Sequence, residues 1–240
     1  MSSTIRRSLK ITVDTDHKVS ALYLAPRAAI ACYVFAHGAG AGMNHPFMAD
    51  VANGLAARKV ASLRYQFPYM EAGSKRPDGP ALAHATVLAA VRAASKLAPR
   101  KALIAGGKSF GGRMTSQAQA ISPLPKVRGL AFVGFPLHPT NKPANDRALH
   151  LSKVEIPMLF VQGDRDALAE RRLLLPIVRR LGPRAVLKSI QGADHSFHVP
   201  ARSGRTDMEA HNELIDGLAL WIKEVASGPG KAFRLTSSNY

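Results

Sequence analysis

The sequence predicts a protein of the α/β class, with a mostly parallel twisted sheet and helices on both of its faces. Short apolar, β-branched runs alternate along the 240 residues with longer segments of helical periodicity, an order typical of parallel sheets. Apolar residues make up 46% of the chain, which is too high for a disordered protein and indicates a buried core. Polar and glycine-rich turns follow several of the apolar runs, where parallel sheets usually carry their functional groups.

The elements follow from these runs in chain order. Strands at residues 9–13 and 21–24 are expected to form an antiparallel hairpin at the start. Further strands are expected at residues 30–36, 61–66, 102–106, 129–134, 157–162 and 184–190. Helices are expected at residues 46–58, 81–97, 110–120, 168–181 and 207–225. The strand at 102–106 is apolar throughout, which indicates that it is buried on both faces.

The breaks between these elements are short enough for one domain. Residues 65–80 and 135–146 are rich in proline and are expected to form two surface excursions. The last segment, 227–240, begins Ser-Gly-Pro-Gly and is expected to be a flexible tail. The sequence therefore predicts a single domain over residues 1–226.

Charge and cysteine content restrict the partners and the location. The 33 lysines and arginines outnumber the 16 acidic residues and give a net charge of +17, which attracts polyanions. The basic residues are scattered singly or in pairs, with no recognition motif, so no specific nucleic-acid partner is expected. The single cysteine, Cys32, excludes an internal disulfide. With no apolar segment long enough to span a membrane and no secretory signal, a cytoplasmic protein is expected.

The most informative motif surrounds Ser109. Residues 107–111 read Gly-Lys-Ser-Phe-Gly and fit G-x-S-x-G between a predicted strand and a predicted helix. A nucleophile on such a sharp turn needs glycine neighbours, because a Cβ two residues away would clash. The helix N-terminus beneath the serine favours developing negative charge. A phosphate-binding loop is excluded because that motif needs glycine where Ala102 stands; a glycine-rich turn with a surface serine is the alternative without chemistry.

A second glycine-rich turn, His37-Gly-Ala-Gly-Ala-Gly42, follows the strand at 30–36. Its position predicts that the backbone amide of Ala39 forms an oxyanion hole with the amide of Phe110. A dinucleotide-binding turn is the alternative, but its third glycine would fall on Met43. His37 is expected to brace the loop.

The acid and base follow in the chain order Ser, Asp, His that this arrangement requires. Asp166 lies just after the strand at 157–162, and His195 follows the next strand. Imidazole titrates near neutral pH and can take the serine proton, while the carboxylate fixes its tautomer. Asp166 is preferred to Asp164, which is expected to hold its loop through backbone hydrogen bonds. His198 is expected to be structural. A metal site formed by His195 and His198 is not expected, because no third ligand follows them in a metal-binding pattern.

These residues belong to a wider set of motifs. The set comprises Phe35-Ala-His-Gly-Ala-Gly40, Arg64-Tyr-Gln-Phe-Pro-Tyr69, Pro77-Asp78, Gly107-Lys-Ser-Phe-Gly-Gly-Arg113, Gly134-Phe-Pro-Leu-His138, Gln162-Gly-Asp-Arg-Asp166 and Asp194-His-Ser-Phe197. It resembles the α/β-hydrolase superfamily, and within it the small lidless members related to dienelactone hydrolases. The narrower resemblance is to the hydrolase-like family of testis-expressed protein 30 and an acetyltransferase-complex subunit. It covers residues 30–225 and implies the α/β-hydrolase fold and a Ser109–Asp166–His195 triad.

The expected function is cleavage of a carboxylic ester, thioester or lactone through an acyl-enzyme, with no cofactor and no metal. The segment between Gly134 and Pro157 leaves no room for a large lid domain, which favours small ester-like substrates. Lys108, Arg113 and Arg165 lie near the triad in sequence, so an anionic substrate is one possibility. The alternative is a binding or scaffold protein that keeps the hydrolase fold without turnover.

Overall fold

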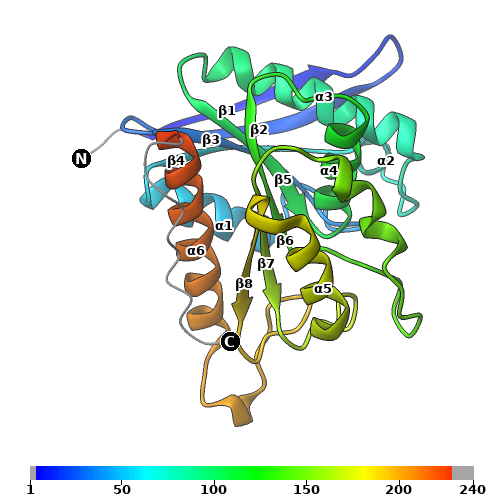
Figure 1. Cartoon of the computed structure of the whole chain (residues 1–240). Helices are drawn as coiled ribbons and strands as arrows, with labels where there is room; N and C mark the ends of the chain where they lie inside the picture. Colours follow the sequence, from blue (N-terminus) through cyan, green and yellow to red (C-terminus); the bar gives the residue numbers. More distant parts are fainter. Residues whose placement is uncertain (1–3, 229–240) are drawn as a thin grey trace.

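An eight-stranded sheet forms the centre of the computed structural model, which describes residues 4–228 (Figure 1). The strand order is β1-β2-β4-β3-β5-β6-β7-β8. The strands are β1 Thr4–Thr12, β2 Lys18–Pro26, β3 Ala31–Ala36, β4 Val60–Tyr65, β5 Ala102–Lys108, β6 Val127–Val133, β7 Met158–Gly163 and β8 Ala185–Ile190. β2 pairs antiparallel with β1 and β4, and every other pair is parallel. The predicted mostly parallel sheet is confirmed.

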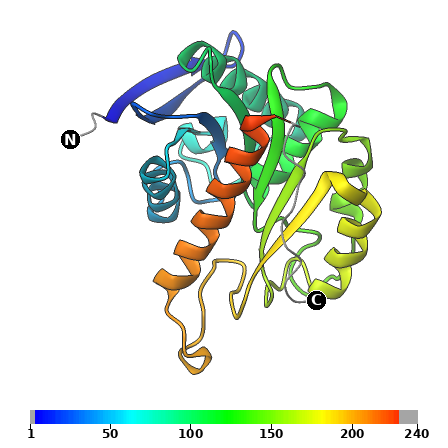
Figure 2. The same cartoon turned by 60° about the vertical axis from the view of Figure 1, so that its left-hand side comes forward.

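Helices cover both faces of this sheet (Figures 1 and 2). The α-helices are α1 Pro46–Ala57, α2 Pro68–Glu71, α3 Pro80–Leu97, α4 Phe110–Ile121, α5 Arg171–Leu181 and α6 Asp207–Ser227. Three short 3₁₀ helices are η1 Asp146–Lys153, η2 Gly182–Arg184 and η3 Ala201–Ser203. One hydrophobic core contains residues of α1 and α6, and the other contains residues of α3, α4 and α5.

The alternation of side chains along each central strand builds these two cores. In β3, Cys32 and Val34 belong to the core beneath α3 and α4, whereas Tyr33 and Phe35 belong to the core beneath α1 and α6. Both sets are buried, because a parallel strand with helices on each side has no solvent face. The central strands therefore hold their C-terminal ends rigidly at one edge, where Ser109 follows β5.

Three differences between the predicted and the observed elements have physical causes. The first strand begins at Thr4 instead of residue 9, because its exposed outer residues pair with β2 without the apolar pattern of a buried strand. The helix expected from residue 168 begins at Arg171, since the amides of Leu168 and Ala169 bond to Asp166. The expected loop at 65–80 contains the short helix α2.

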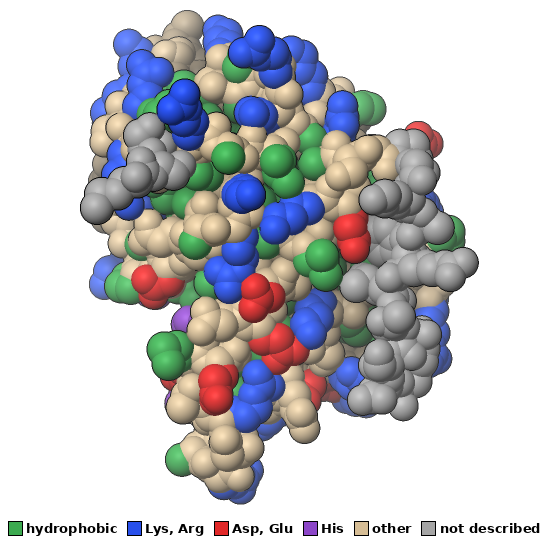
Figure 3. All heavy atoms as spheres, turned by 90° about the vertical axis from the view of Figure 1, so that its left-hand side faces the viewer, with side chains coloured by type: hydrophobic (Ala, Val, Ile, Leu, Met, Phe, Trp, Pro, Cys, Tyr) green, Lys and Arg blue, Asp and Glu red, His purple; other side chains and the backbone are tan. Residues whose placement is uncertain are grey.

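The chain between β6 and β7 contains a loop and η1 only, so the expected absence of a large lid is confirmed. At the C-terminus, α6 continues to Ser227, one residue into the tail predicted over 227–240. Residues 229–240 of that segment lie outside the described residues. Among residues 4–228, every helix is too short or too polar to cross a membrane. Basic side chains are spread over the face shown in Figure 3, with acidic ones among them.

Candidate active site

Ser109 occupies the sharp turn between β5 and α4. Its backbone angles, φ 49° and ψ −114°, are unusual for a residue with a side chain and store strain. The flanking glycines make the turn possible: a Cβ at Gly107 would lie 2.5 Å from the carbonyl oxygen of Ala36, and one at Gly111 would lie 2.5 Å from that of His37. Both clashes are with backbone, so the glycines of G-x-S-x-G are required by the close approach of β3 to this turn.

The structure brings Ser109, His195 and Asp166 together. His195 Nε2 lies 3.0 Å from Ser109 Oγ, and His195 Nδ1 lies 2.7 Å from Asp166 Oδ2. Asp166 is 2% exposed, and its Oδ1 accepts from the backbone amide of Leu168 at 2.8 Å. Asp164 does not reach the histidine; its Oδ1 accepts from the amide of Gly192 at 2.8 Å. These contacts orient the imidazole with Nδ1–H toward the carboxylate and Nε2 toward the hydroxyl.

Gln162, at the end of β7, supports the carboxylate. Its side-chain amide donates to Asp166 Oδ2, and its side-chain oxygen accepts from the amide of Phe135 at 2.8 Å. Gln162 is 3% exposed, so both bonds are shielded from water. Gln162 lies in a predicted strand, but its role was not predicted, because a lone glutamine at a strand end has no distinctive pattern.

The turn after β3 lies against Ser109. The ideal Cβ position of Gly38 is 3.8 Å from Ser109 Cβ, and Ala39 lines the same cleft as Ser109 and Phe110. Within residues 4–228, neither the amide of Ala39 nor that of Phe110 donates a hydrogen bond to another protein atom. The cleft that contains Ser109 is thus lined by two residues whose N–H groups have no partner in the described part of the protein.

The segment after β4 holds this turn in place. The amide of Gly40 donates to Tyr69 Oη at 3.1 Å, and the amide of Met43 donates to Gln66 Oε1 at 2.7 Å. His37 is fully buried, with Nδ1 2.7 Å from the carbonyl oxygen of Gly38 and Nε2 accepting from the amide of Phe67 at 3.1 Å. Burial lowers the pKa of His37 to about 4, so the ring is neutral at pH 7 and braces the turn.

The cleft above Ser109 has a volume of about 410 Å³. Its walls come from the turn at Ala39, the segment 77–80, α4, the loop after β6 and η1. Two arginines, Arg113 and Arg147, line it, and burial, together with the positive charge of Arg147, lowers the pKa of Arg113. The buried Nε of Arg113 has no hydrogen-bond partner among the described residues. The carboxylate of Asp78 also lines the cleft, so two arginines against one carboxylate leave its wall with an excess of positive charge close to the serine.

The basic residues near the triad in sequence occupy different places. Arg113 lies on the cleft wall, whereas Arg165 is exposed and does not line the cleft. Lys108 turns away from the cleft toward the backbone of His195. Arg147, which does line the cleft, was not predicted, because η1 reaches α4 only through the tertiary fold.

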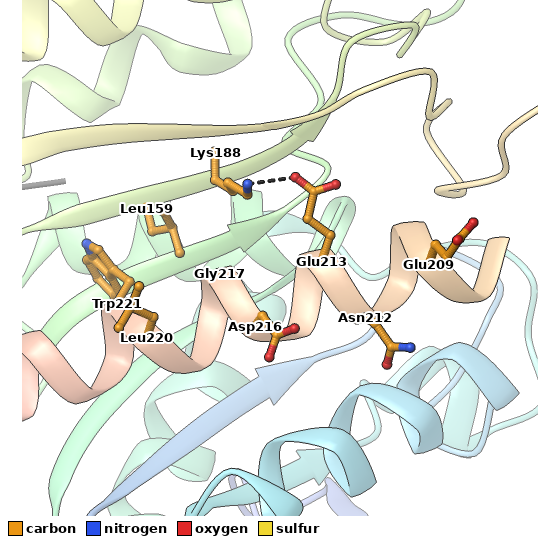
Figure 4. A pocket seen from close by; sticks show the side chains of 9 residues that line it. All are labelled: Leu159, Lys188, Glu209, Asn212, Glu213, Asp216, Gly217, Leu220 and Trp221. Carbon is orange, nitrogen blue, oxygen red and sulfur yellow. Dashed lines mark hydrogen bonds and ion pairs between the residues drawn. The ribbon is translucent and has the colours of Figure 1, made fainter. Parts of the chain in front are cut away.

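A second hollow, of about 520 Å³, lies along α6 (Figure 4). It shares no lining residue with the Ser109 cleft and contains no serine, cysteine or histidine. Lys188 and Glu213 form an ion pair at 2.6 Å on its wall (Figure 4). It therefore offers no hydroxyl or thiol nucleophile paired with a histidine base.

Metal ligation has no geometric support in the part of the chain that the structure describes. No group of three or more histidine, cysteine, aspartate or glutamate side chains is placed there to hold an ion. His198, the second histidine of the loop, lies 2.9 Å from Asp207 Oδ2 at the start of α6. That contact ties the loop to the helix.

The sheet order, the strained serine turn and the two hydrogen bonds to Ser109 and Asp166 define an α/β hydrolase arrangement. A family model described as "Alpha/beta hydrolase domain" matches residues 29–223, and the chain belongs to this family. The predicted superfamily and the hydrolase class are therefore confirmed. The narrower resemblance to the family of testis-expressed protein 30 stays a prediction.

Solved structures agree with this fold. A dienelactone hydrolase from Anabaena variabilis is 19% identical, with a TM-score of 0.74 over 92% of this chain and 98% of that one. An α/β serine hydrolase homologue from Coxiella burnetii is 19% identical, with a TM-score of 0.71 over 88% and 97%. A serine hydrolase without a lid from Xanthomonas campestris is 16% identical, with a TM-score of 0.68 over 90% and 94%. At these identities the likeness establishes the fold alone.

Proposed function

We propose that this protein is a serine hydrolase that cleaves carboxylic esters, thioesters or lactones, with Ser109, His195 and Asp166 as its catalytic triad. The observation that carries the proposal is the continuous pair of contacts, 3.0 Å from Ser109 Oγ to His195 Nε2 and 2.7 Å from His195 Nδ1 to Asp166 Oδ2. A serine hydroxyl needs such a base to become nucleophilic near neutral pH. A binding protein has no physical need for this chain of contacts at an open cleft.

Acylation follows from the geometry. His195 Nε2 takes the proton of Ser109 as Oγ attacks the substrate carbonyl carbon, and the carbonyl oxygen becomes an oxyanion. The amides of Ala39 and Phe110 donate to that oxygen, and the N-terminus of α4 adds a favourable dipole. His195 then gives its proton to the leaving alcohol or thiol as the carbonyl re-forms, which leaves an ester of Ser109.

Deacylation uses the same groups. Water loses a proton to His195 Nε2 and attacks the acyl-enzyme, and the proton passes to Ser109 Oγ as the acid leaves. Asp166 stabilises the imidazolium that forms in both steps without itself becoming protonated. Gln162 and the amide of Leu168 satisfy the carboxylate, so its orientation is fixed before substrate binds.

The cleft favours small or surface-presented substrates that carry negative charge. Since no lid covers Ser109, an acyl chain gains little enclosed apolar surface beyond the 410 Å³ cleft. Arg113 and Arg147 on its wall can bind a carboxylate or a similar anion on the substrate.

We further infer a cytoplasmic location from the single, buried cysteine.

A substrate panel tests the proposal. Purified wild type and Ser109→Ala are compared on p-nitrophenyl esters of increasing acyl length, a thioester and a lactone. Wild type is expected to turn over the short esters, with a rate that does not rise steadily toward long chains. Ser109→Ala is expected to lose all turnover while remaining folded. A folded wild type with no activity on any member of the panel would favour the scaffold alternative.

A further inference from the structure

Lys108, the residue directly before the candidate nucleophile, is directed away from the substrate cleft. It is the last residue of β5, and its Nζ donates to the backbone carbonyl oxygen of His195 at 2.6 Å. The same residue is thus joined by a peptide bond to Ser109 and by a hydrogen bond to His195. This contact connects the serine segment to the histidine segment without involving the Ser109 hydroxyl or the His195 ring.

The surroundings of the ammonium group are built to hold it. Nζ lies 5.4 Å from the ring centre of Phe197 and 5.9 Å from that of Phe47, within the range of a cation–π interaction. The two rings stack on each other at 5.9 Å. On a further side, a Cβ at Gly134 would lie 2.9 Å from Nζ, so the absence of a side chain there leaves room for the ammonium.

Within residues 4–228, the other hydrogen bonds of the His195 loop do not involve the backbone of His195. Its internal bonds run from the amides of Ser196 and His198 to Asp194 Oδ1, at 2.7 and 3.0 Å. Phe197 adopts φ 66°, a left-handed conformation that costs energy for a residue with a Cβ. The His198–Asp207 contact ties the far end of this loop to α6, whereas the Lys108 contact restrains the backbone of His195 directly.

We propose that Lys108 is a positioning residue, whose ammonium group fixes the His195 backbone and thereby sets the distance between the imidazole and Ser109 Oγ. The proposal rests on the proposed function for its kinetic consequence, but the restraint itself can be measured without turnover. The charged and titratable groups that face the Lys108 ammonium are the carboxylates of Asp166 and Asp194 and the His195 ring. Helix α1 contributes the uncharged ring of Phe47, and His211 of α6 packs against that ring.

The charge of Lys108 gives the restraint a pH signature. Burial lowers the pKa of Lys108 to about 8, although Asp166 and Asp194 oppose the shift. Above that pH the neutral amine is a weaker donor than the ammonium, because charge-assisted hydrogen bonds are roughly twice as strong. An arginine at this position keeps its charge throughout.

Two measurements on Lys108→Met, Lys108→Arg and wild type test the proposal, with Arg165→Met as the matched loss of an exposed cation near the triad. The first is the rate of fluorophosphonate labelling of Ser109 against pH. Lys108→Met is expected to label about 100-fold more slowly, the effect of displacing a catalytic group by about 1 Å, whereas Arg165→Met labels normally. The labelling rate of wild type is expected to fall above pH 8, whereas that of Lys108→Arg is not.

The second measurement is amide hydrogen exchange in residues 194–198, which reports the restraint even if no serine is labelled. Lys108→Met is expected to exchange faster there than wild type and Arg165→Met. The proposal is overturned if Lys108→Met is labelled and exchanges its amides at the same rates as wild type. It is also overturned if the labelling rates of wild type and Lys108→Arg depend on pH in the same way. If Lys108→Met does not fold, the pH comparison decides. Absence of labelling in wild type itself would count against the proposed function and leave the exchange result to decide the role of Lys108.

Discussion

The side-chain amide of Gln162 donates to Asp166 Oδ2, the same oxygen that accepts the hydrogen bond from His195. Gln162 also accepts from the amide of Phe135, so it connects the acid to the loop after β6. The end of β7 and the loop after β6 thus fix the orientation of a single carboxylate. The precision of the site depends on residues that do no chemistry themselves.

Replacing Gln162 with leucine is expected to affect stability and activity together. The change leaves the amide of Phe135 without its partner and frees Asp166 to rotate, at a cost of about 1–3 kcal/mol in unfolding free energy. We expect kcat for a short ester to fall about 10-fold, since the imidazole loses its fixed acceptor. Urea unfolding and steady-state kinetics measure the two effects.

Gln119→Leu is the matched control for this prediction. Gln119 is another buried glutamine, and its side-chain oxygen accepts from the amide of Leu124 at 2.9 Å, away from the triad. It should lose similar stability and keep the wild-type kcat. Equal losses of kcat in the two variants would show that Gln162 acts only through stability.

Asp166 and Asp164 are expected to differ in effect by orders of magnitude. Asp166→Asn presents an amide to His195 Nδ1 and favours the wrong tautomer, a change that costs about 10⁴-fold in kcat in a comparable triad. Asp164→Asn keeps an oxygen that can accept from the amide of Gly192, so kcat should change little. Steady-state kinetics of the two folded variants on one ester decide between the carboxylates, and the reverse order would assign the acid to Asp164.

His37 makes stability depend on pH between about 4 and 6.5. Its pKa of about 4 in the folded protein lies below the unfolded value of about 6.5. The unfolded chain therefore binds a proton in this window that the folded protein excludes, and stability is lost as the pH falls. Between pH 7 and 5 this residue should cost about 2 kcal/mol of unfolding free energy.

His37→Gln isolates that contribution, since glutamine can donate to the carbonyl of Gly38 and accept from Phe67 without titrating. Every other titrating group, including His150 with its pKa also lowered to about 4 by burial, is common to both proteins. Urea unfolding at pH 7 and 5 should show a smaller loss for His37→Gln by about 2 kcal/mol. Equal losses would mean that His37 takes up its proton in the folded state.

Arg147 is expected to determine the preference for anionic substrates. Arg147→Gln should lower kcat/KM for mono-p-nitrophenyl succinate about 10-fold, because a charge-assisted hydrogen bond is lost. The value for neutral p-nitrophenyl butyrate should be unchanged. Arg179→Gln, which removes an exposed charge from α5, should affect neither. A parallel loss on both esters would exclude an anion-specific role.

The sequence predicted the parts of the fold that local chemistry determines. The glycines around Ser109 and the turn after His37 could be interpreted because backbone approaches this close tolerate no Cβ. The central strands were found from their continuous apolar runs. Strand β1 was predicted too short because its outer residues are polar and exposed, and its pairing with β2 leaves no apolar signal.

The supporting contacts of the site were beyond prediction for a different reason. Gln66, Gln162 and Tyr69 are ordinary polar residues, and the backbone amides that donate to them lie 23 to 29 residues away along the chain. Arg147 reaches the cleft only because η1 packs against α4. These roles arise from tertiary proximity, which no spacing rule in the sequence encodes.

The proposed function depends above all on activation of the Ser109 hydroxyl by His195. Mass mapping of the wild type after treatment with a fluorophosphonate tests it most directly, with Ser109→Ala and His195→Ala as controls. We predict a single adduct in wild type, on Ser109, and no adduct in Ser109→Ala. Folded His195→Ala should be labelled much more slowly than wild type. An adduct on another residue, or a folded wild type that stays unmodified, would show that Ser109 is not an activated nucleophile.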